Sequence, residues 1–107
     1  MTFDYYRSLI GEYLNLGNSE EKLLAEIGYP ENIDLSPDEL IRAVSIIGAA
    51  AENDIKKLVE LSGLSMRATA TKFAIPYRTL QDWCNGNRSA TPYIVMLIGY
   101  ALIGDKQ

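Results

Sequence analysis

The sequence predicts an all-α fold, and three observations support this prediction. Apolar side chains recur every three or four residues along most of the 107-residue chain, as on the buried face of a helix. The strict alternation of apolar and polar residues that marks a β-strand is absent. Serine, proline and glycine stand where helices begin and end. A chain of this length buries one core, so we expect a small bundle of five to seven helices.

Two helices are expected in the N-terminal third. Gly17 ends the first of these helices, and Ser19 caps the second, shorter one, which Gly28 ends. Residues 29–35, "YPENIDL", read as a loop. The first helix turns inward Phe3, Tyr6, Ile10 and Tyr13, and the second turns inward Leu23, Leu24 and Ile27.

The central segment carries a strong helix start. Ser36 is the expected N-cap, Pro37 takes the first helical position, and Glu39 closes a capping box. The apolar period then continues from Leu40 to about Leu61. It is compatible with one long helix or two nearly continuous ones, and we favour a break near residues 52–54.

A further pair of short helices follows Gly63. Ser65 caps the first of the pair, whose inner face is Ala70 and Phe73, with Thr69 alongside. The chain turns through "AIP", and Pro76 begins a second helix that has Leu80 and Trp83 inward and Gly86 as its stop. This spacing predicts a helix-turn-helix, in which the second helix presents its polar face to the major groove of DNA.

The stretch "SGLS…IPYRTLQDW…G.R…P.Y…LI.YAL" resembles the phage-repressor, or Xre-like, helix-turn-helix regulators over about residues 53–103. The resemblance implies four helices of that family's bundle, over residues 53–62, 66–73, 76–84 and 92–103, with the third as the recognition helix. It also implies that the protein binds double-stranded DNA as a dimer. The fold class becomes a helical bundle with a helix-turn-helix (53–107) and an acidic N-terminal helical extension (1–52).

The candidate DNA-binding residues form two groups. The polar face of the second helix carries side chains that suit base edges, and the resemblance places them at base-facing positions: Tyr77, Arg78, Gln81 and Asp82. Other basic or polar side chains of the motif are expected near the DNA backbone. The resemblance implies this for Ser65, Asn85, Asn87 and Arg88, and it places Met66 at such a position as well. The full backbone group is Ser65, Arg67, Lys72, Asn85, Asn87 and Arg88.

Several residues depart from the family pattern. Met66 stands where glutamine is frequent, Thr69 replaces a buried leucine, and Ala74 replaces the glycine of the turn. A left-handed conformation at Ala74 would cost about 1 kcal/mol. Asp82 and Cys84 lower the polarity and positive charge of the second helix. We expect the fold to tolerate these changes, whereas DNA binding is either retained, weakened or exchanged for protein binding.

The charges divide the chain into two unlike halves. Residues 1–54 carry three basic and eleven acidic side chains, a net charge of −8, whereas residues 55–107 carry seven basic and three acidic ones, a net charge of +4. A positive half suits a polyanion. The negative half opposes DNA phosphates, so we expect residues 1–50 not to bind DNA but to serve as a dimer interface, a protein-binding surface, or both.

The chemistry-bearing residue types argue against an enzyme. Cys84 is the only cysteine and histidine is absent, so neither a Cys-His nucleophile nor a zinc site can form. We expect no cofactor. A single cysteine also excludes an internal disulfide, which fits a reducing cytoplasm. The longest apolar run, residues 93–103, is too short to span a membrane, and the first ten residues do not read as a signal peptide.

Two functional hypotheses remain open from the sequence. The first is a sequence-specific transcriptional regulator, a repressor or an antitoxin-like protein, that uses the helix-turn-helix on an operator. The second is a phage or plasmid protein-binding inhibitor, such as an anti-CRISPR, whose acidic half blocks a nucleic-acid-binding surface. In that case the helix-turn-helix is autoregulatory or only a scaffold. The closing helix, apolar on nearly all sides from Tyr93 to Ile103, requires cover on more than one side and favours a homodimer.

Overall fold

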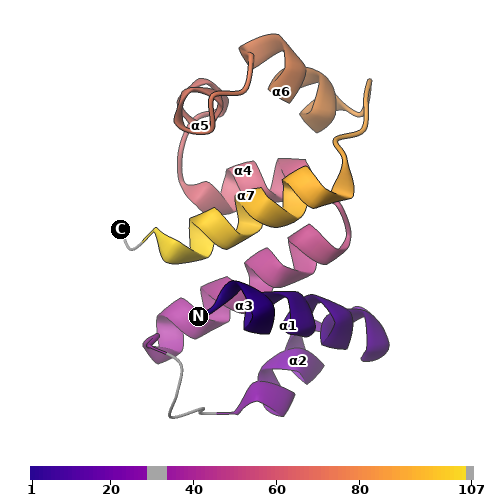
Figure 1. Cartoon of the computed structure of the whole chain (residues 1–107), viewed down its shortest axis with the longest axis vertical. Helices are drawn as coiled ribbons and strands as arrows, with labels where there is room; N and C mark the ends of the chain where they lie inside the picture. Colours follow the sequence, from indigo (N-terminus) through magenta and orange to yellow (C-terminus); the bar gives the residue numbers. More distant parts are fainter. Residues whose placement is uncertain (29–33, 106–107) are drawn as a thin grey trace.

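The computed structural model describes residues 1–28 and 34–105, and within them it contains seven helices and no strand (Figure 1). The prediction of an all-α fold is therefore confirmed. The loop predicted over residues 29–35 lies mostly outside the described residues. The helices are α1 (Phe3–Asn15), α2 (Glu20–Ile27), α3 (Pro37–Ala51), α4 (Ile55–Ser62), α5 (Met66–Lys72), α6 (Tyr77–Asn85) and α7 (Pro92–Gly104).

Three helices begin directly after the capping serines that the sequence predicts, namely α2 after Ser19, α3 after Ser36 and α5 after Ser65. In the capping box of α3, the Ser36 hydroxyl oxygen accepts from the Glu39 N–H at 3.2 Å, and the Glu39 carboxylate accepts from the Ser36 N–H at 2.9 Å. Ser19 and Ser65 cap α2 and α5 with 3.1 Å bonds from the N–H groups three residues later. These bonds satisfy donors that the first turn of a helix leaves unpaired.

The predicted break between the two central helices is also present. Helix α3 ends at Ala51, and Asn53 adopts a positive φ of 56°. The Asp54 side chain then accepts from the Lys57 N–H at 3.1 Å and caps α4. Asparagine and aspartate tolerate or favour these two conformations, so the turn is encoded locally.

Helix α3 is the centre of the bundle. It contacts α1 and α2 on one side and α4 and α7 on the other (Figure 1). Its buried residues are branched or small, which allows neighbouring helices to approach from several directions: Leu40, Ala43, Val44, Ile46, Ile47, Gly48, Ala49 and Ala50. The buried side chains before and after residue 53 belong to one hydrophobic cluster, so the acidic segment and the helix-turn-helix segment share a core.

Two tyrosines of α1 reach this core where glycines leave room. The Tyr6 hydroxyl is buried and donates to the Met96 carbonyl at 2.7 Å, and a Cβ placed on Gly99 would lie 2.5 Å from the same hydroxyl oxygen. Tyr13 packs its ring against Gly48 and donates to the Glu52 carboxylate. Desolvation by burial raises the pKa of both tyrosines, so both remain protonated donors.

Helix α7 is covered by α3 and α4, and the Phe3 and Tyr6 side chains of α1 also contact it. Val95, Ile98 and Leu102 turn into the core. On the opposite side of the helix, Tyr93 is 61% exposed, and Ile94 and Leu97 are each 38% exposed. A single chain therefore buries only part of the apolar surface of α7. These three side chains form an apolar stripe that remains exposed to solvent.

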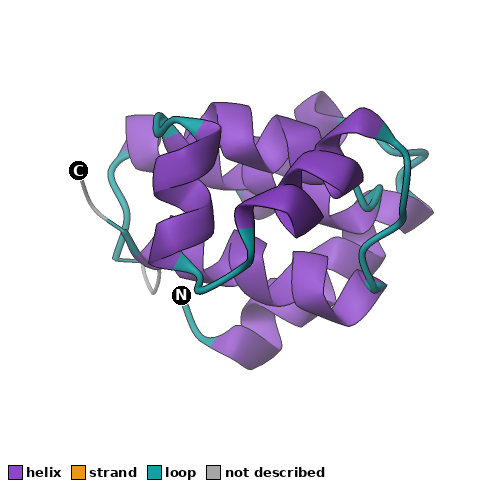
Figure 2. Ribbon diagram, turned by 90° about the horizontal axis from the view of Figure 1, so that it is seen from above, coloured by secondary structure: helices purple, strands orange, loops and turns teal. Residues whose placement is uncertain are grey.

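The molecule measures 40 × 29 × 20 Å. Along its long axis, α5 and α6 form one end, α1 and α2 form the other, and the remaining helices lie between them (Figure 1). Figure 2 looks onto the α5 and α6 end, where the two short helices lie above the rest of the bundle. The predicted helix-turn-helix thus stands away from the acidic N-terminal helices.

Candidate nucleic-acid interface

The segment from Ser65 to Asn85 folds as helix, turn and helix. Helix α5 ends at Lys72, and the turn is closed by a 2.9 Å bond from the Ile75 N–H to the Ala70 carbonyl. Ala74 has a positive φ of 53°, as expected for the position where the family pattern has glycine. The second helix begins at Tyr77, one residue later than predicted, because Pro76 has an extended ψ of 134° and serves as its N-cap.

The inner faces of α5 and α6 pack on each other and on α4. Leu80, Ala70 and Thr69 are buried, and the Thr69 hydroxyl donates to the Ser65 carbonyl at 2.8 Å. The prediction that Phe73 and Trp83 are core residues holds only in part, because both are partly buried and pack against the cluster from its edge. Their rings span the boundary between core and solvent.

The four base-reading candidates differ in exposure. Arg78 has an 85% exposed side chain, and its Nε lies 3.7 Å from a carboxylate oxygen of Asp82, which is only 20% exposed. Gln81 is half-buried. Tyr77 is also half-buried, and the Arg67 guanidinium carbon lies 4.2 Å from the centroid of its ring. Arg78 is therefore the most accessible of the four.

The backbone candidates surround the two helices. Arg67, Asn85, Asn87 and Arg88 are exposed. The N–H groups of the last two residues donate to the Asp82 carbonyl at 3.0 and 3.3 Å, which fixes the chain just after α6.

Two other backbone candidates already have partners. The Ser65 hydroxyl is occupied as the cap of α5. Lys72 forms a 2.5 Å ion pair with Asp105, at the C-terminal end of α7. A phosphate would have to compete with this carboxylate for the ammonium group.

Three interactions in and around the motif could not be read from the sequence. These are the cation-π contact of Arg67 with Tyr77, the ion pair of Lys72 with Asp105 and the contacts of Arg42, and each joins segments that are distant along the chain or lie in different helices. The Arg42 guanidinium donates to the carbonyls of Leu61 at 3.2 Å and Leu102 at 3.1 Å. Local spacing carries no signal for such pairs, because each depends on how distant segments pack.

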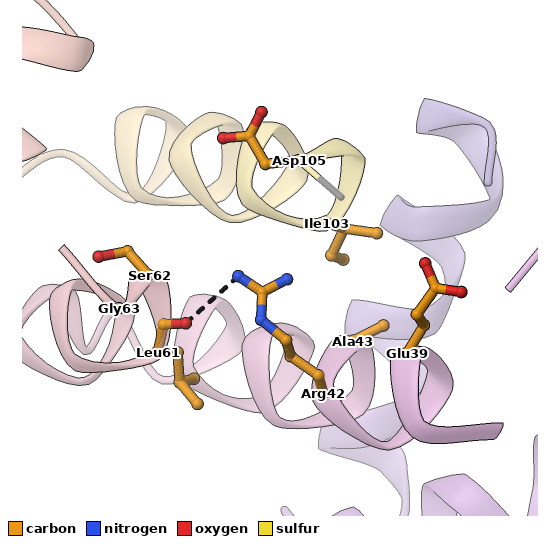
Figure 3. A pocket seen from close by; sticks show the side chains of 8 residues that line it. All are labelled: Glu39, Arg42, Ala43, Leu61, Ser62, Gly63, Ile103 and Asp105. Atoms are coloured by element: carbon orange, nitrogen blue, oxygen red, sulfur yellow. Dashed lines mark hydrogen bonds between the residues drawn. The ribbon is translucent and has the colours of Figure 1, made fainter. Parts of the chain in front are cut away.

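A cavity of about 210 Å³ lies beside Arg42 (Figure 3). Its other lining residues include Glu39, Ser62 and Asp105. The Arg42 guanidinium bonds carbonyls near the C-terminal ends of α4 and α7, where a cation is favoured by the helix dipole. The geometry therefore assigns Arg42 to holding α3 against these two helix ends.

Cys84 is half-buried, and burial raises the pKa of its thiol. A protonated thiol is a poor nucleophile. In the described part of the chain, no three His, Cys, Asp or Glu side chains gather as a metal-binding group.

A polar cluster joins the acidic half to α4. Glu20 accepts from the Ser45 hydroxyl at 2.6 Å and pairs with Lys57 at 3.2 Å. The Ser45 hydrogen bond, followed by Lys57, holds the pKa of the Glu20 carboxyl below its usual value despite burial. This carboxylate is thus engaged in holding α2, α3 and α4 together.

The chain matches no protein-family model, no curated protein and no solved structure. The resemblance to Xre-like regulators therefore stays a prediction from the sequence. Within residues 1–28 and 34–105, none of the helices has the length and the apolar character that a membrane span requires.

Proposed function

We propose that this protein is a sequence-specific DNA-binding transcriptional regulator, repressor-like or antitoxin-like, that uses α5 and α6 as a helix-turn-helix. The observation that carries the proposal is the exposed face of α6. It stands at one end of the molecule with Arg78 85% exposed (Figure 1). An arginine early in such a helix suits bidentate bonding to the O6 and N7 of guanine.

The charge distribution also supports DNA binding at the α5 and α6 end of the molecule. Residues 55–107, which include α5 and α6, carry a net charge of +4, and residues 1–54 carry −8. Attraction to phosphates supplies most of the non-specific affinity of a DNA-binding protein. The α5 and α6 end is the end that DNA would attract, and the acidic end would be turned away.

Binding to DNA is tested with the full chain. A duplex is selected from a randomised pool, and the upstream region of the protein's own gene is assayed beside it, at several salt concentrations. Arg78→Ala is compared with Arg88→Ala as the matched variant, since both remove one exposed arginine. Arg78→Ala is expected to cost about 1 to 3 kcal/mol on the selected duplex and much less on a random one. Arg88→Ala should weaken both duplexes alike and lower the salt slope by about one.

The contrary outcome is also informative. If both variants bind DNA as the parent does but lose the protein's effect in cells, α6 does not read DNA. The second hypothesis would then apply, namely an inhibitor of another protein, such as an anti-CRISPR. The acidic excess of residues 1–54 favours that function, because such a surface can occupy the nucleic-acid-binding site of a partner.

The proposed regulator acts as a homodimer. The apolar stripe of Tyr93, Ile94 and Leu97 on α7 is exposed in the single chain. A helix that carries no charged residue from Pro92 to Gly104 is better suited to meeting another apolar surface than water. A second copy, which presents the same uncharged stripe, satisfies this requirement without bringing like charges together.

A further inference from the structure

Arg67 and Tyr77 form a contact that links the two helices of the motif. Arg67 lies in the first turn of α5, and Tyr77 is the first residue of α6. The guanidinium carbon is 4.2 Å from the centre of the tyrosine ring, which is within the range of a cation-π interaction. The contact therefore spans the turn and brings the beginnings of the two helices together.

The two side chains have different surroundings. Tyr77 is half-buried and packs against the hydrophobic cluster, so the bundle holds its ring in place. Arg67 is exposed. One face of the ring is covered by the guanidinium, and that face is closed to a thymine methyl group or a base.

Stacking does not use the hydrogen-bonding capacity of arginine. The five N–H donors of a guanidinium lie in its plane, so they remain free when the group stacks on a ring. Among the basic residues of α5 and α6, Lys72 is paired with Asp105 and Arg78 lies near Asp82, whereas no carboxylate of the described residues pairs with Arg67. Arg67 is thus an exposed cation that the Tyr77 ring helps to hold in place, and its donors are available to an anion.

We propose that Tyr77 is a positioning residue that presents Arg67 to a phosphate of the DNA backbone, instead of reading a base itself. This inference rests on the proposed function and refines it. Within the motif, Arg78 supplies the sequence-dependent contact, and the Arg67 and Tyr77 pair supplies a contact that is indifferent to sequence.

The test is a double-mutant cycle on DNA binding by the full chain. Four proteins are compared with the parent: Tyr77→Phe, Tyr77→Leu, Arg67→Ala and the double variant Tyr77→Leu/Arg67→Ala. Tyr77→Phe keeps the ring, and Tyr77→Leu keeps an apolar side chain without it. Affinity is measured for the selected duplex, for its single-base variants and for a random duplex, over a range of salt concentrations and at a temperature where thermal melting shows every protein folded.

The proposal predicts four results. Tyr77→Phe should bind as the parent does. Tyr77→Leu should bind all duplexes more weakly by up to about two- to five-fold, because Arg67 is no longer held by an exposed cation-π contact of that strength and must be ordered when DNA binds. Arg67→Ala should weaken all duplexes alike and lower the salt slope by about one. In the Arg67→Ala background, Tyr77→Leu should have no further effect, because its contribution passes through Arg67.

The experiment distinguishes failure of this inference from failure of the proposed function. If Tyr77→Leu still weakens binding in the Arg67→Ala background, or its effect depends on one base pair, Tyr77 contacts DNA directly and the inference is wrong. The DNA-binding function itself is unaffected by that result. If the parent chain selects and binds no duplex, the proposed function fails and the inference fails with it.

A second variant covers the case in which Tyr77→Leu does not fold. Arg67→Lys keeps the positive charge but replaces the planar guanidinium with a flexible, strongly hydrated ammonium, which the ring holds less well. It should therefore weaken all duplexes alike, by about two- to five-fold. Binding of Arg67→Lys that equals binding of the parent would overturn the proposal.

Discussion

Ala74 is held in the left-handed backbone region in the turn between α5 and α6, with a φ of 53°. This conformation costs an L-residue with a Cβ about 1 kcal/mol or more, and glycine adopts it without that cost. We expect Ala74→Gly to raise the free energy of unfolding by up to about 1 kcal/mol, because the relief of strain exceeds the entropy that glycine adds to the unfolded chain. Chemical denaturation measures the change.

Two asparagines with positive φ serve as controls for this substitution. Asn18, with a φ of 60°, is exposed, and asparagine already tolerates the left-handed region, so Asn18→Gly should change stability little. Asn53, with a φ of 56°, donates through its side-chain amide to the Ala90 carbonyl at 3.2 Å. Asn53→Gly removes that bond and should destabilise the protein. A loss of stability in Ala74→Gly would contradict the strain argument.

At the scale of elements, the approach of α1 to α7 depends on Gly99. A Cβ at this position would lie 2.5 Å from the Tyr6 hydroxyl oxygen and 3.2 Å from the Ala50 Cβ. Gly99→Ala is expected to destabilise the fold by about 1 to 3 kcal/mol through overpacking, although alanine is the better helix former. Gly11→Ala in α1 is the matched control, because nothing lies within 4 Å of the added Cβ, and it should stabilise by up to about 1 kcal/mol. Equal effects in thermal melting would show that Gly99 is not a contact position.

Helix boundaries were predictable because their signals are local. Ser36, Ser65 and Asn53 act within a few residues of themselves, so the sequence alone indicates the starts of α3 and α5 and the break before α4. The left-handed Ala74 was expected only from the glycine that the family pattern has in this turn, because alanine itself disfavours that conformation. The positions of α5 and α6 in the candidate site were therefore predictable to within one or two residues.

The ion pairs, ring contacts and side-chain burial of the candidate site were not predictable in the same way. Lys72 is separated by 33 positions from its partner Asp105, and the residue type of Tyr77 is as consistent with base contact as with stacking under Arg67. The partial burial of Phe73 and Trp83 likewise depends on how α5 and α6 pack on the rest of the bundle. Each of these properties follows from packing between elements. Helical periodicity predicts which face of a helix is buried, but it does not predict which residues that face contacts.

At the scale of the whole molecule, the net charge changes sign along the long axis. The α1 and α2 end lies in the half with a net charge of −8, and the α5 and α6 end lies in the half with +4, at opposite ends of a body 40 Å long. A protein with such a distribution is turned by a polyanion before contact. This orienting effect would present α6 first and would weaken as salt is added.

The exposed stripe on α7 leads to a prediction about assembly. Tyr93, Ile94 and Leu97 are all exposed, but three side chains make a small patch compared with the roughly 800 Å² that each partner buries in a standard interface. We therefore expect a weak, concentration-dependent homodimer. Leu97→Glu should abolish it, because pairing two stripes would bury unpaired carboxylates. Leu14→Glu, at a 47% exposed leucine of α1, changes charge equally and should leave the dimer intact. Sedimentation velocity over a range of concentrations distinguishes these outcomes, and a parent chain that stays monomeric throughout would exclude the homodimer.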